Sequence, residues 1–365
     1  MRVSFFLASL RGGGAERSVV NLCDYFIDQG YDVDLVLVDY VGQYISILNK
    51  KVNIFNFSKR RSFHSIFSLR KYILKRQPDI LMSSVIHLNL ISIFTKLIIF
   101  NKIKTKIFLN QVNHMTSAMS KSQNNLTYFE KFKFKTITLL YSFSDGLISM
   151  SQGVMEDMKS YGMLKNSNLT YIYNPIYRDN LIPVENALPH FTKPTFISVG
   201  RLEYQKNFFF LLKAFAKVRE KINCQLIILG QGSEESDLKK YSRSLNIMDD
   251  VNFLGFVENP YSYMQRADTF VLSSRWEGFG NVIVEALACG IQIVSTNCNS
   301  GPSEILDNGK YGFLAEVDEV EKFSDLMITS LDSKIEKKLL INRAKTFSID
   351  KIGRKYEDFF SSKLT

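Results

Sequence analysis

The stretch SRWEGFGNVIVEALACG, residues 274–290, decides the fold predicted for this chain. The apolar run before it, ADTFVLSS (267–274), predicts a buried strand, and the apolar spacing after the glycines predicts a helix from about Asn281. Gly278 and Gly280 let the backbone turn tightly, and the start of a helix presents unpaired N–H groups and a positive dipole end. We therefore expect an anion-binding loop between a strand and a helix.

Two carboxylates, Glu277 and Glu285, lie eight positions apart across this junction. On a helical wheel Glu285 falls off the apolar stripe that contains Ile283 and Leu287, and its Cβ leans back toward the loop. A carboxylate beside a bound phosphate would repel it, so Glu285 is better suited to accept hydrogen bonds from a ribose diol, and Glu277 from sugar hydroxyls. The competing interpretation is an ordinary acid near a helix N-terminus and a solvated helix residue.

The same plan of strand, loop and helix recurs along the chain, which is too long for one typical core and suits two α/β domains with parallel sheets. Val320 to about Phe360 is predicted to form successive helices. We expect strands at Val3–Leu10, Asp32–Val38, Asp79–Val85, Lys106–Val112, Asp145–Ser151 and Thr170–Ile176 in the first half, and at residues 195–200, 225–230, 251–256, 269–274 and 291–296 in the second.

Two cations follow the expected strand at 195–200, in the sequence VGRLEYQKN. Arg201 and Lys206 would lie at the carboxyl edge of a parallel sheet, where ligands bind in open α/β folds, and the pair could clamp a diphosphate. A solvated basic loop is the alternative. LGQGSEESDL (229–238) contains a lone G-x-G, which is a weak signal because such loops often serve only as a turn.

The net charge of +10 resides in the first half of the chain. Between Val41 and Phe129 there are 14 basic residues and one acid, Asp79, and nine of the basic residues lie between Lys50 and Arg76. This pattern predicts an anionic partner, and we expect a membrane surface rather than nucleic acid, because no reader motif accompanies the charge. The apolar residues of KRRSFHSIFSLRKYILKR (59–76) would either enter the interface or pack on the sheet.

Other features narrow the class of protein. The four cysteines have no C-x-x-C spacing and no histidine pair, so we expect neither a disulfide nor a metal site, in keeping with a reducing cytoplasm. Asp32-Val33-Asp34 spells D-x-D, but its place at the start of a strand predicts a coincidence. Residues 80–100 form the most apolar window, which His87, Asn89 and Lys96 interrupt, so no membrane-spanning helix is expected.

Several motifs together resemble the retaining glycosyltransferases of family four, especially those that build bacterial O-antigen, capsule and related surface polysaccharides. The resemblance rests on Gly-Gly-Ala-Glu at 13–16, Asn113-His114, SVGRLEYQKNF (198–208), the E-x₇-E stretch within 254–290 and SGPSEIL (300–306). It implies a GT-B architecture of two Rossmann-like doubly wound domains facing across a cleft. The implied boundaries are an acceptor-side domain at 1–178, a linker at 179–193, a nucleotide-sugar domain at 194–345, and a C-terminal helix at 346–365 packing back on the first domain.

The resemblance also implies roles for single residues. Arg201 and Lys206 would hold the donor diphosphate, Glu285 the ribose and Glu277 the hydroxyls of the transferred sugar. The remaining donor-side positions are the backbone N–H groups of Phe279, Gly280 and Asn281, and Gly13 and Gly14 from the first domain. His114 would lie at the sugar side of the cleft and, with Arg201, Lys206 and Glu277, complete the catalytic set. One departure is Gln292, where the family usually has proline.

The implied reaction is metal-independent and retaining, with no cofactor beyond a UDP-sugar donor and with catalysis that is largely electrostatic. A hexose or N-acetylhexosamine would pass to a polyprenyl-diphosphate-linked or other lipid-linked glycan at the inner face of the cytoplasmic membrane, where the protein would be peripheral. Two alternatives stay open: a nucleotide-sugar epimerase on the same fold, and a non-catalytic protein that binds membrane surfaces. The second would leave the glycine loops and both glutamates idle.

Overall fold

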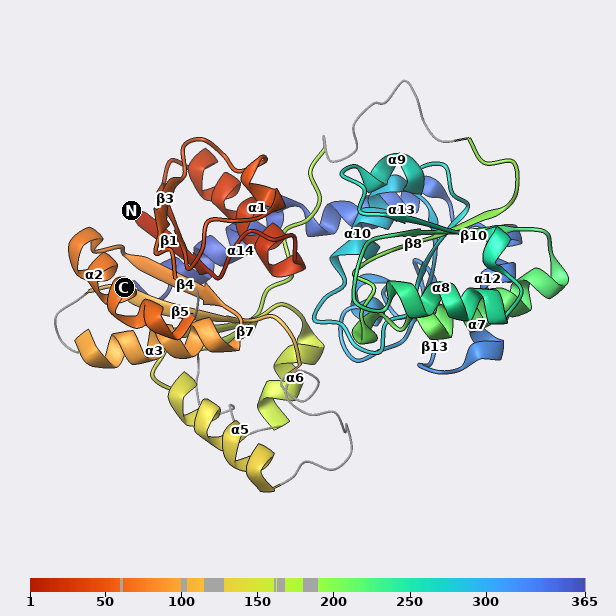
Figure 1. Ribbon diagram of the computed structural model, residues 1–365. Helices are drawn as coiled ribbons and strands as arrows, with labels where there is room; N and C mark the ends of the chain where they lie inside the picture. The colour runs from red at the N-terminus through yellow and green to blue at the C-terminus, as the bar shows by residue number, and fades with distance from the viewer. Residues whose placement is uncertain are drawn as a thin grey trace. The chain divides into compact units, whose positions relative to one another are not determined.

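The computed structural model describes residues 1–59, 62–99, 104–114, 128–160, 162, 168–179 and 190–364, and the chain divides into two compact units (Figure 1). Unit 1 comprises Met1–Ile176 and Ile349–Thr365, and unit 2 comprises Tyr177–Ser348. The C-terminal helix therefore belongs to unit 1. Most of the expected linker at 179–193 lies outside the described residues.

Unit 1 is built on a parallel sheet with the strand order β3-β2-β1-β4-β5-β6-β7 in the part of the chain that the structure describes. The strands are β1 (Arg2–Leu7), β2 (Asp32–Leu37), β3 (Asn53–Asn56), β4 (Ile80–Ser84), β5 (Lys106–Gln111), β6 (Gly146–Ser149) and β7 (Leu169–Tyr171). The helices are α1 (Gly14–Asp28), α2 (Ser65–Arg76), α3 (Ile86–Ile99), α5 (Tyr128–Tyr141), α6 (Gln152–Ser160) and α14 (Ile349–Ser361).

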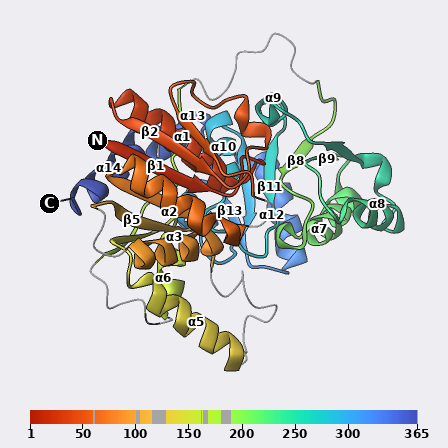
Figure 2. The same ribbon diagram turned by 60° about the vertical axis from the view of Figure 1, so that its left-hand side comes forward.

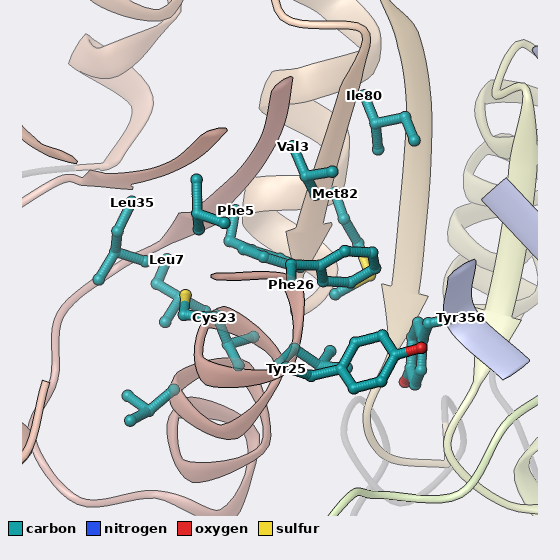
Figure 3. Close-up of a cluster of buried hydrophobic side chains, with 14 of the residues drawn as sticks. Val3, Phe5, Leu7, Cys23, Tyr25, Phe26, Leu35, Ile80, Met82 and Tyr356 are labelled. Carbon is teal, nitrogen blue, oxygen red and sulfur yellow. The ribbon is translucent and has the colours of Figure 1, made fainter. Parts of the chain in front are cut away.

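Alternate residues of these strands fill two cores, one on each face of the sheet. On one face Phe5 and Met82 pack against α1 and α14, as the labelled side chains of Figure 3 show around Phe26 and Tyr356. On the other face the strands pack against α2, α3, α5 and α6. Burial on both faces is what the continuous apolar runs of the sequence predict for a parallel sheet.

Helix α14 is fixed to unit 1 by close packing and by two hydrogen bonds. A Cβ at Gly353 would lie 2.3 Å from the ring of Tyr25, so glycine lets the helix approach α1 closely. Tyr25 and Tyr31 each donate a hydroxyl hydrogen bond of 2.6 Å to the Glu357 carboxylate. Hydrogen bonding to that carboxylate, together with burial, raises the pKa of Tyr31 to about 12.

Unit 2 repeats the plan, with the strand order β10-β9-β8-β11-β12-β13 among its described residues and parallel pairing throughout. Helices α7, α8 and α12 cover one face of the sheet. The strands are β8 (Thr195–Val199), β9 (Gln225–Leu229), β10 (Val251–Gly255), β11 (Thr269–Leu272), β12 (Gln292–Thr296) and β13 (Phe313–Ala315). The helices are α7 (Phe208–Lys221), α8 (Glu235–Ser244), α9 (Pro260–Met264), α10 (Asn281–Cys289), α11 (Pro302–Ile305), α12 (Val320–Asp332) and α13 (Lys337–Ala344).

The prediction of two Rossmann-like α/β domains with parallel sheets is confirmed. Strands β3 and β13 were not predicted. β3 is a mostly exposed edge strand with asparagine at both ends, and β13 is only three residues long, so neither presents a clear apolar pattern. Among the described residues no helix has both the length and the apolar character needed to cross a membrane.

Candidate functional site

The loops that follow β8 and β11 meet at the carboxyl edge of the unit 2 sheet. β8 pairs with β9 on one side and with β11 on the other, so the order in which successive strands are added to the parallel sheet reverses at the junction of β8 and β11. Such a topological switch point is where open α/β sheets bind ligands. The β8 loop carries Arg201 and Lys206, and the β11 loop carries Glu277.

The structure brings Lys206 and Glu277 into direct contact. Lys206 Nζ lies 2.6 Å from Glu277 Oε1, and both side chains are largely buried, with exposed fractions of 16% and 8%. Ser274 Oγ donates a second hydrogen bond, of 2.7 Å, to the same oxygen. A charge-assisted pair in a partly desolvated setting holds both groups in fixed positions.

Backbone contacts join the two loops into one unit. The Arg275 N–H donates to the Gln205 carbonyl over 2.8 Å, and Gln205 Nε2 donates to the Trp276 carbonyl over 2.9 Å. Ser273 Oγ donates to the Lys206 carbonyl over 2.8 Å. The cationic loop and the carboxylate loop therefore cannot shift independently without losing several hydrogen bonds.

The G-x-G of the sequence braces the cationic loop from the other side. Gly230 has φ +137°, and a Cβ there would lie 1.9 Å from the Gly200 carbonyl oxygen. A Cβ at Gly232 would lie 2.2 Å from the Leu202 carbonyl oxygen. Both glycines are thus required for the close approach of two backbones, a role that the weak motif alone did not reveal.

Arg201 is exposed, in contrast to Lys206. Its neighbour Glu203 accepts hydrogen bonds from Ser233 N and Oγ at 3.0 and 2.8 Å. These bonds lower the pKa of the Glu203 carboxyl, and the positive charge of Arg201 lowers it further. Arg201, which is predicted to bind a diphosphate, is therefore exposed to solvent, while the loop that carries it is held in place through Glu203.

The glycine loop leads directly into α10, as predicted. Gly280 is the N-cap of the helix, with φ +97° and no side-chain cap hydrogen bond, and Asn281 is the first helical residue. Phe279 is buried and its ring contacts that of Phe347 at 5.5 Å. The backbone of Gly301 lies so close to that of Phe279 that a Cβ on Gly301 would lie 1.9 Å from the Phe279 carbonyl oxygen. These contacts fix the turn that presents the helix start.

Glu285 lies in the second turn of α10 and is partly buried. Tyr261 of α9 donates a long hydrogen bond of 3.4 Å from its hydroxyl to Glu285 Oε1. Sequence reasoning did not single out Tyr261 or Ser274. The signal for Tyr261 was Asn259-Pro260, which predicts a helix start: the Asn259 side chain caps that helix by accepting from the Tyr261 N–H.

In unit 1 the predicted residues also lie at the carboxyl edge of the sheet, in the loops after β1 and β5. Gly13 is the N-cap of α1, and a Cβ there would lie 2.1 Å from Glu16 Oε2, so the carboxylate folds over the glycine. Gly14 begins the helix. His114 is buried, and its Nδ1 lies 3.4 Å from Asp157 Oδ1 of α6.

The D-x-D aspartates lie at the opposite, amino-terminal edge of this sheet. Arg2 pairs with Asp32 at 2.6 Å, and Arg76 pairs with Asp34 at 2.9 Å. Tyr72 also donates a hydrogen bond of 2.6 Å to Asp34 Oδ2. In the described part of the chain no cluster of acidic, histidine or cysteine side chains is suited to hold a metal ion.

Comparison with known proteins identifies the family of the chain. Residues 12–180 match the family described as Glycosyltransferase Family 4, and residues 185–347 match Glycosyl transferases group 1. The chain is 30% identical over 358 residues to the N-acetylgalactosamine-N,N'-diacetylbacillosaminyl-diphospho-undecaprenol 4-alpha-N-acetylgalactosaminyltransferase of Campylobacter jejuni, covering 94% of each chain. It is also 30% identical over 227 residues to the lipopolysaccharide 1,6-galactosyltransferase of Escherichia coli, covering 60% of this chain and 59% of the relative.

Solved structures share the fold of this chain. The crystal structure of Anabaena HepE in complex with UDP-glucose superimposes with a TM-score of 0.80 at 18% identity, covering 99% of this chain and 100% of the other. The lipopolysaccharide outer core galactosyltransferase WaaB superimposes with a TM-score of 0.75 at 19% identity over the whole of both chains. With both family matches and a full-length relative at 30% identity, this chain belongs to the family 4 glycosyltransferases and has their GT-B fold.

Proposed function

We propose that the protein transfers a hexose or N-acetylhexosamine from a UDP-sugar to a lipid-linked oligosaccharide, with retention of configuration at the anomeric carbon. The acceptor would be linked through polyprenyl diphosphate or another lipid, in the synthesis of a surface polysaccharide. Support for the acceptor class comes from the Campylobacter relative, whose name includes diphospho-undecaprenol. Support for the donor class comes from HepE, which was crystallised with UDP-glucose.

The observation that carries the proposal is the contact between Lys206 and Glu277 at the switch point of the unit 2 sheet. A lysine suited to a phosphate oxygen and a carboxylate suited to sugar hydroxyls are held 2.6 Å apart, beside the glycine-capped start of α10. A UDP-sugar carries its diphosphate on the anomeric carbon and its hydroxyls on other carbons of the same sugar. The two groups would therefore suit the phosphate side and the sugar side of the bond that must break.

The other residues take roles around that bond. Arg201, exposed on the same loop, would bind the second face of the diphosphate, and the backbone N–H groups of residues 279–281 would add donors at the helix start. Glu285 would accept from the ribose hydroxyls. Gly13 and Gly14 of unit 1 would let the backbone approach the donor, and His114 would contact the transferred sugar.

The chemistry would be a substitution at the anomeric carbon. The bond from that carbon to the β-phosphate oxygen breaks, and its electron pair leaves with UDP. The acceptor hydroxyl oxygen attacks from the same face, and its proton passes to a departing phosphate oxygen. Lys206, Arg201 and the N-terminus of α10 stabilise the growing negative charge in advance, so no metal ion is assigned a role.

The protein would work as a peripheral protein on the inner face of the cytoplasmic membrane, where a lipid-linked acceptor is presented. The excess of basic residues in unit 1 supports an anionic surface as its partner.

The test is direct: the purified chain is incubated with a panel of nucleotide sugars and a lipid-linked acceptor, with and without EDTA. We expect release of UDP and a product heavier by one sugar, with an α linkage from an α-linked donor, and undiminished activity in EDTA. Loss of activity in EDTA that Mn²⁺ restores would overturn the metal-independent mechanism. Epimerisation of free donor without transfer would favour the epimerase.

A further inference from the structure

Three neighbouring helices of unit 1 carry large apolar side chains on their outer sides. Helix α3 packs against both α2 and α5, on one face of the sheet, and Figure 2 shows α2 and α3 side by side there. We call the outer sides of these helices the α2–α3–α5 face. Its exposed apolar residues are Phe67, Phe94, Leu97, Ile98, Tyr128, Phe132 and Leu139, and exposed Phe63 and Phe143 lie in the turns just before α2 and just after α5.

These side chains are additional to the core. The inner sides of the same helices already fill it with residues such as Leu69, Leu88 and Phe134. Tyr128, Phe132 and Leu139 recur at intervals of four and seven residues, which keeps them on one side of α5, and Phe143 follows in the turn after the helix. Each is at least 46% exposed, and Tyr128 is 90% exposed. Apolar stripes left in water on adjacent helices indicate a surface that meets a partner.

Positive charge lies among these apolar side chains. Exposed Lys71 and Lys75 continue the side of α2 that begins with Phe67, at steps of four residues, and exposed Lys135 lies between Phe132 and Leu139 on α5. The three helices contain eight basic residues and one acidic residue, Glu130. Aromatic and aliphatic side chains mixed with lysines are typical of helices that lie in the headgroup region of an anionic bilayer.

The sequence left open whether the apolar residues of 59–76 pack on the sheet or face outward, and the structure shows some of each. Ile66 and Ile73 pack in the core, whereas Phe63 and Phe67 are 70% and 76% exposed. The helix therefore packs on the sheet and still presents an apolar edge. Arg60, Arg61 and Lys102, three of the basic residues between Val41 and Phe129, lie outside the described residues.

We propose that the α2–α3–α5 face docks on a leaflet that contains anionic phospholipid, with its aromatic side chains in the interface and its lysines at the headgroups. The inference deepens the proposed function, on which it rests for its biological purpose, by assigning the membrane contact to residues of α2, α3 and α5. A leaflet is favoured over an acidic protein because the apolar and basic residues spread over three helices rather than converge on one groove.

The first test uses the full chain and sedimentation with vesicles. We expect binding to vesicles of equal parts phosphatidylglycerol and phosphatidylcholine that weakens with salt, and little binding to pure phosphatidylcholine. The variant Phe67→Ser/Phe94→Ser/Phe132→Ser should bind at least about tenfold more weakly, because three apolar side chains no longer enter the interface. Leu339→Ser in α13 removes an apolar residue that is also exposed, at 48%, and should bind as the wild type does.

The second variant tests the charges. Lys71→Gln/Lys75→Gln/Lys135→Gln should weaken binding by about fivefold for each lysine removed. Lys334→Gln/Lys338→Gln, which changes exposed lysines of unit 2, is the matched control. Equal binding of the wild type to both kinds of vesicle, or wild-type binding by both test variants, would overturn the docking surface. So would a dimer in sedimentation velocity that the serine variant disperses, since the face would then be occupied by a second copy.

Transfer to a water-soluble acceptor analogue separates this inference from the proposed function. Variants that lose vesicle binding but keep this transfer support the docking surface. A wild type that transfers sugar but does not bind vesicles refutes the docking surface and leaves the proposed function intact. A wild type that binds vesicles in the expected way but transfers no sugar from the donor panel refutes the proposed function and leaves the docking surface intact.

Discussion

Each sheet has an ion pair at one of its edges, Asp34–Arg76 in unit 1 and Glu277–Lys206 in unit 2. The two pairs differ in the number of hydrogen bonds that the carboxylate accepts. Asp34, fully buried at the amino edge of the unit 1 sheet, accepts from Arg76 twice, from Tyr72 and from Asn53. Glu277, at the carboxyl edge of the unit 2 sheet, accepts from Lys206 and Ser274, and both bonds end on Oε1.

This difference separates a structural pair from a working one. Four hydrogen bonds use the accepting capacity of Asp34, so it has none to offer a ligand. Among the side chains that the structure describes, none donates to Oε2 of Glu277, and Lys206 has donors left beyond its one carboxylate. A pair that is fixed but not saturated can bind a substrate without first losing its own contacts. The comparison predicts that mutation at the first pair costs stability and mutation at the second costs catalysis.

The largest effect is expected at the second pair. Lys206→Ala should lower kcat by about 10²–10³-fold, because it removes a preorganised positive charge where negative charge develops. Arg201→Ala should also lower turnover, while the preference among donor sugars changes little in both variants. Steady-state release of UDP measures both effects. Lys213→Ala, an exposed lysine of α7, is the control. Full turnover in both test variants would mean that the diphosphate binds elsewhere.

The first pair should behave in the opposite way. Arg76→Met removes the guanidinium that donates to the buried Asp34 carboxylate and leaves only that of Arg2, at 3.9 Å, which should destabilise unit 1 by about 3 kcal/mol. Urea unfolding measures the loss, and the turnover of the protein that remains folded should be unchanged. The double variant Asp34→Asn/Arg76→Met should recover part of the stability, because the buried charge is gone. A turnover defect in Arg76→Met at temperatures where it is folded would contradict the structural role.

Glu285 offers a smaller effect within the working site. Glu285→Ala should weaken donor affinity and turnover by about 1.5–3 kcal/mol, since a ribose diol would lose a charged acceptor. Tyr261→Phe should cost less, because a hydrogen bond of 3.4 Å is already weak. Titration with UDP and steady-state kinetics on both variants test this order. Wild-type kinetics in Glu285→Ala would remove the ribose role.

The sequence could predict the fold because its signals are local. Apolar runs mark most strands, and glycines such as Gly280 mark the turn that enters a helix. Edge strands give weaker signals. β3 has no continuous apolar run, because an edge strand is mostly exposed to water. In α10 the predicted stripe residues Ile283 and Leu287 are buried, and Val284 outside the stripe is buried as well, because α10 has neighbours on more than one side.

The site was less predictable because its contacts are distant in sequence. Lys206 and Glu277 were each selected by motif, yet their contact joins residues 71 positions apart, in loops that follow strands adjacent only in the folded sheet. Ser274 was quoted as the end of a strand, and Tyr261 only fell within the motif stretch 254–290; neither residue type indicates by itself which side chain it will contact. The role of Gly230 and Gly232 needed the backbone of the neighbouring loop.

The smallest effect is expected from Ser274, which holds the carboxylate without being placed on the substrate. The hydroxyl of Ser274 is fully buried and donates a hydrogen bond of 2.7 Å to Glu277 Oε1. Ser274→Ala removes this donor to a charged group, at a cost of about 1.5 kcal/mol, or roughly tenfold in kcat. KM for the donor should change less, because Lys206 still anchors the same oxygen.

Ser300→Ala is the matched control for that prediction. Ser300 Oγ donates 2.9 Å to the backbone carbonyl of Glu277 rather than to its carboxylate, so its loss should loosen the loop without freeing the charged group. Thermal unfolding should report similar small changes for both variants, while kcat should fall mainly in Ser274→Ala. If the two variants lower kcat equally, the loop backbone rather than the carboxylate sets the rate. If Ser274→Ala turns over like the wild type, Lys206 alone suffices to hold Glu277.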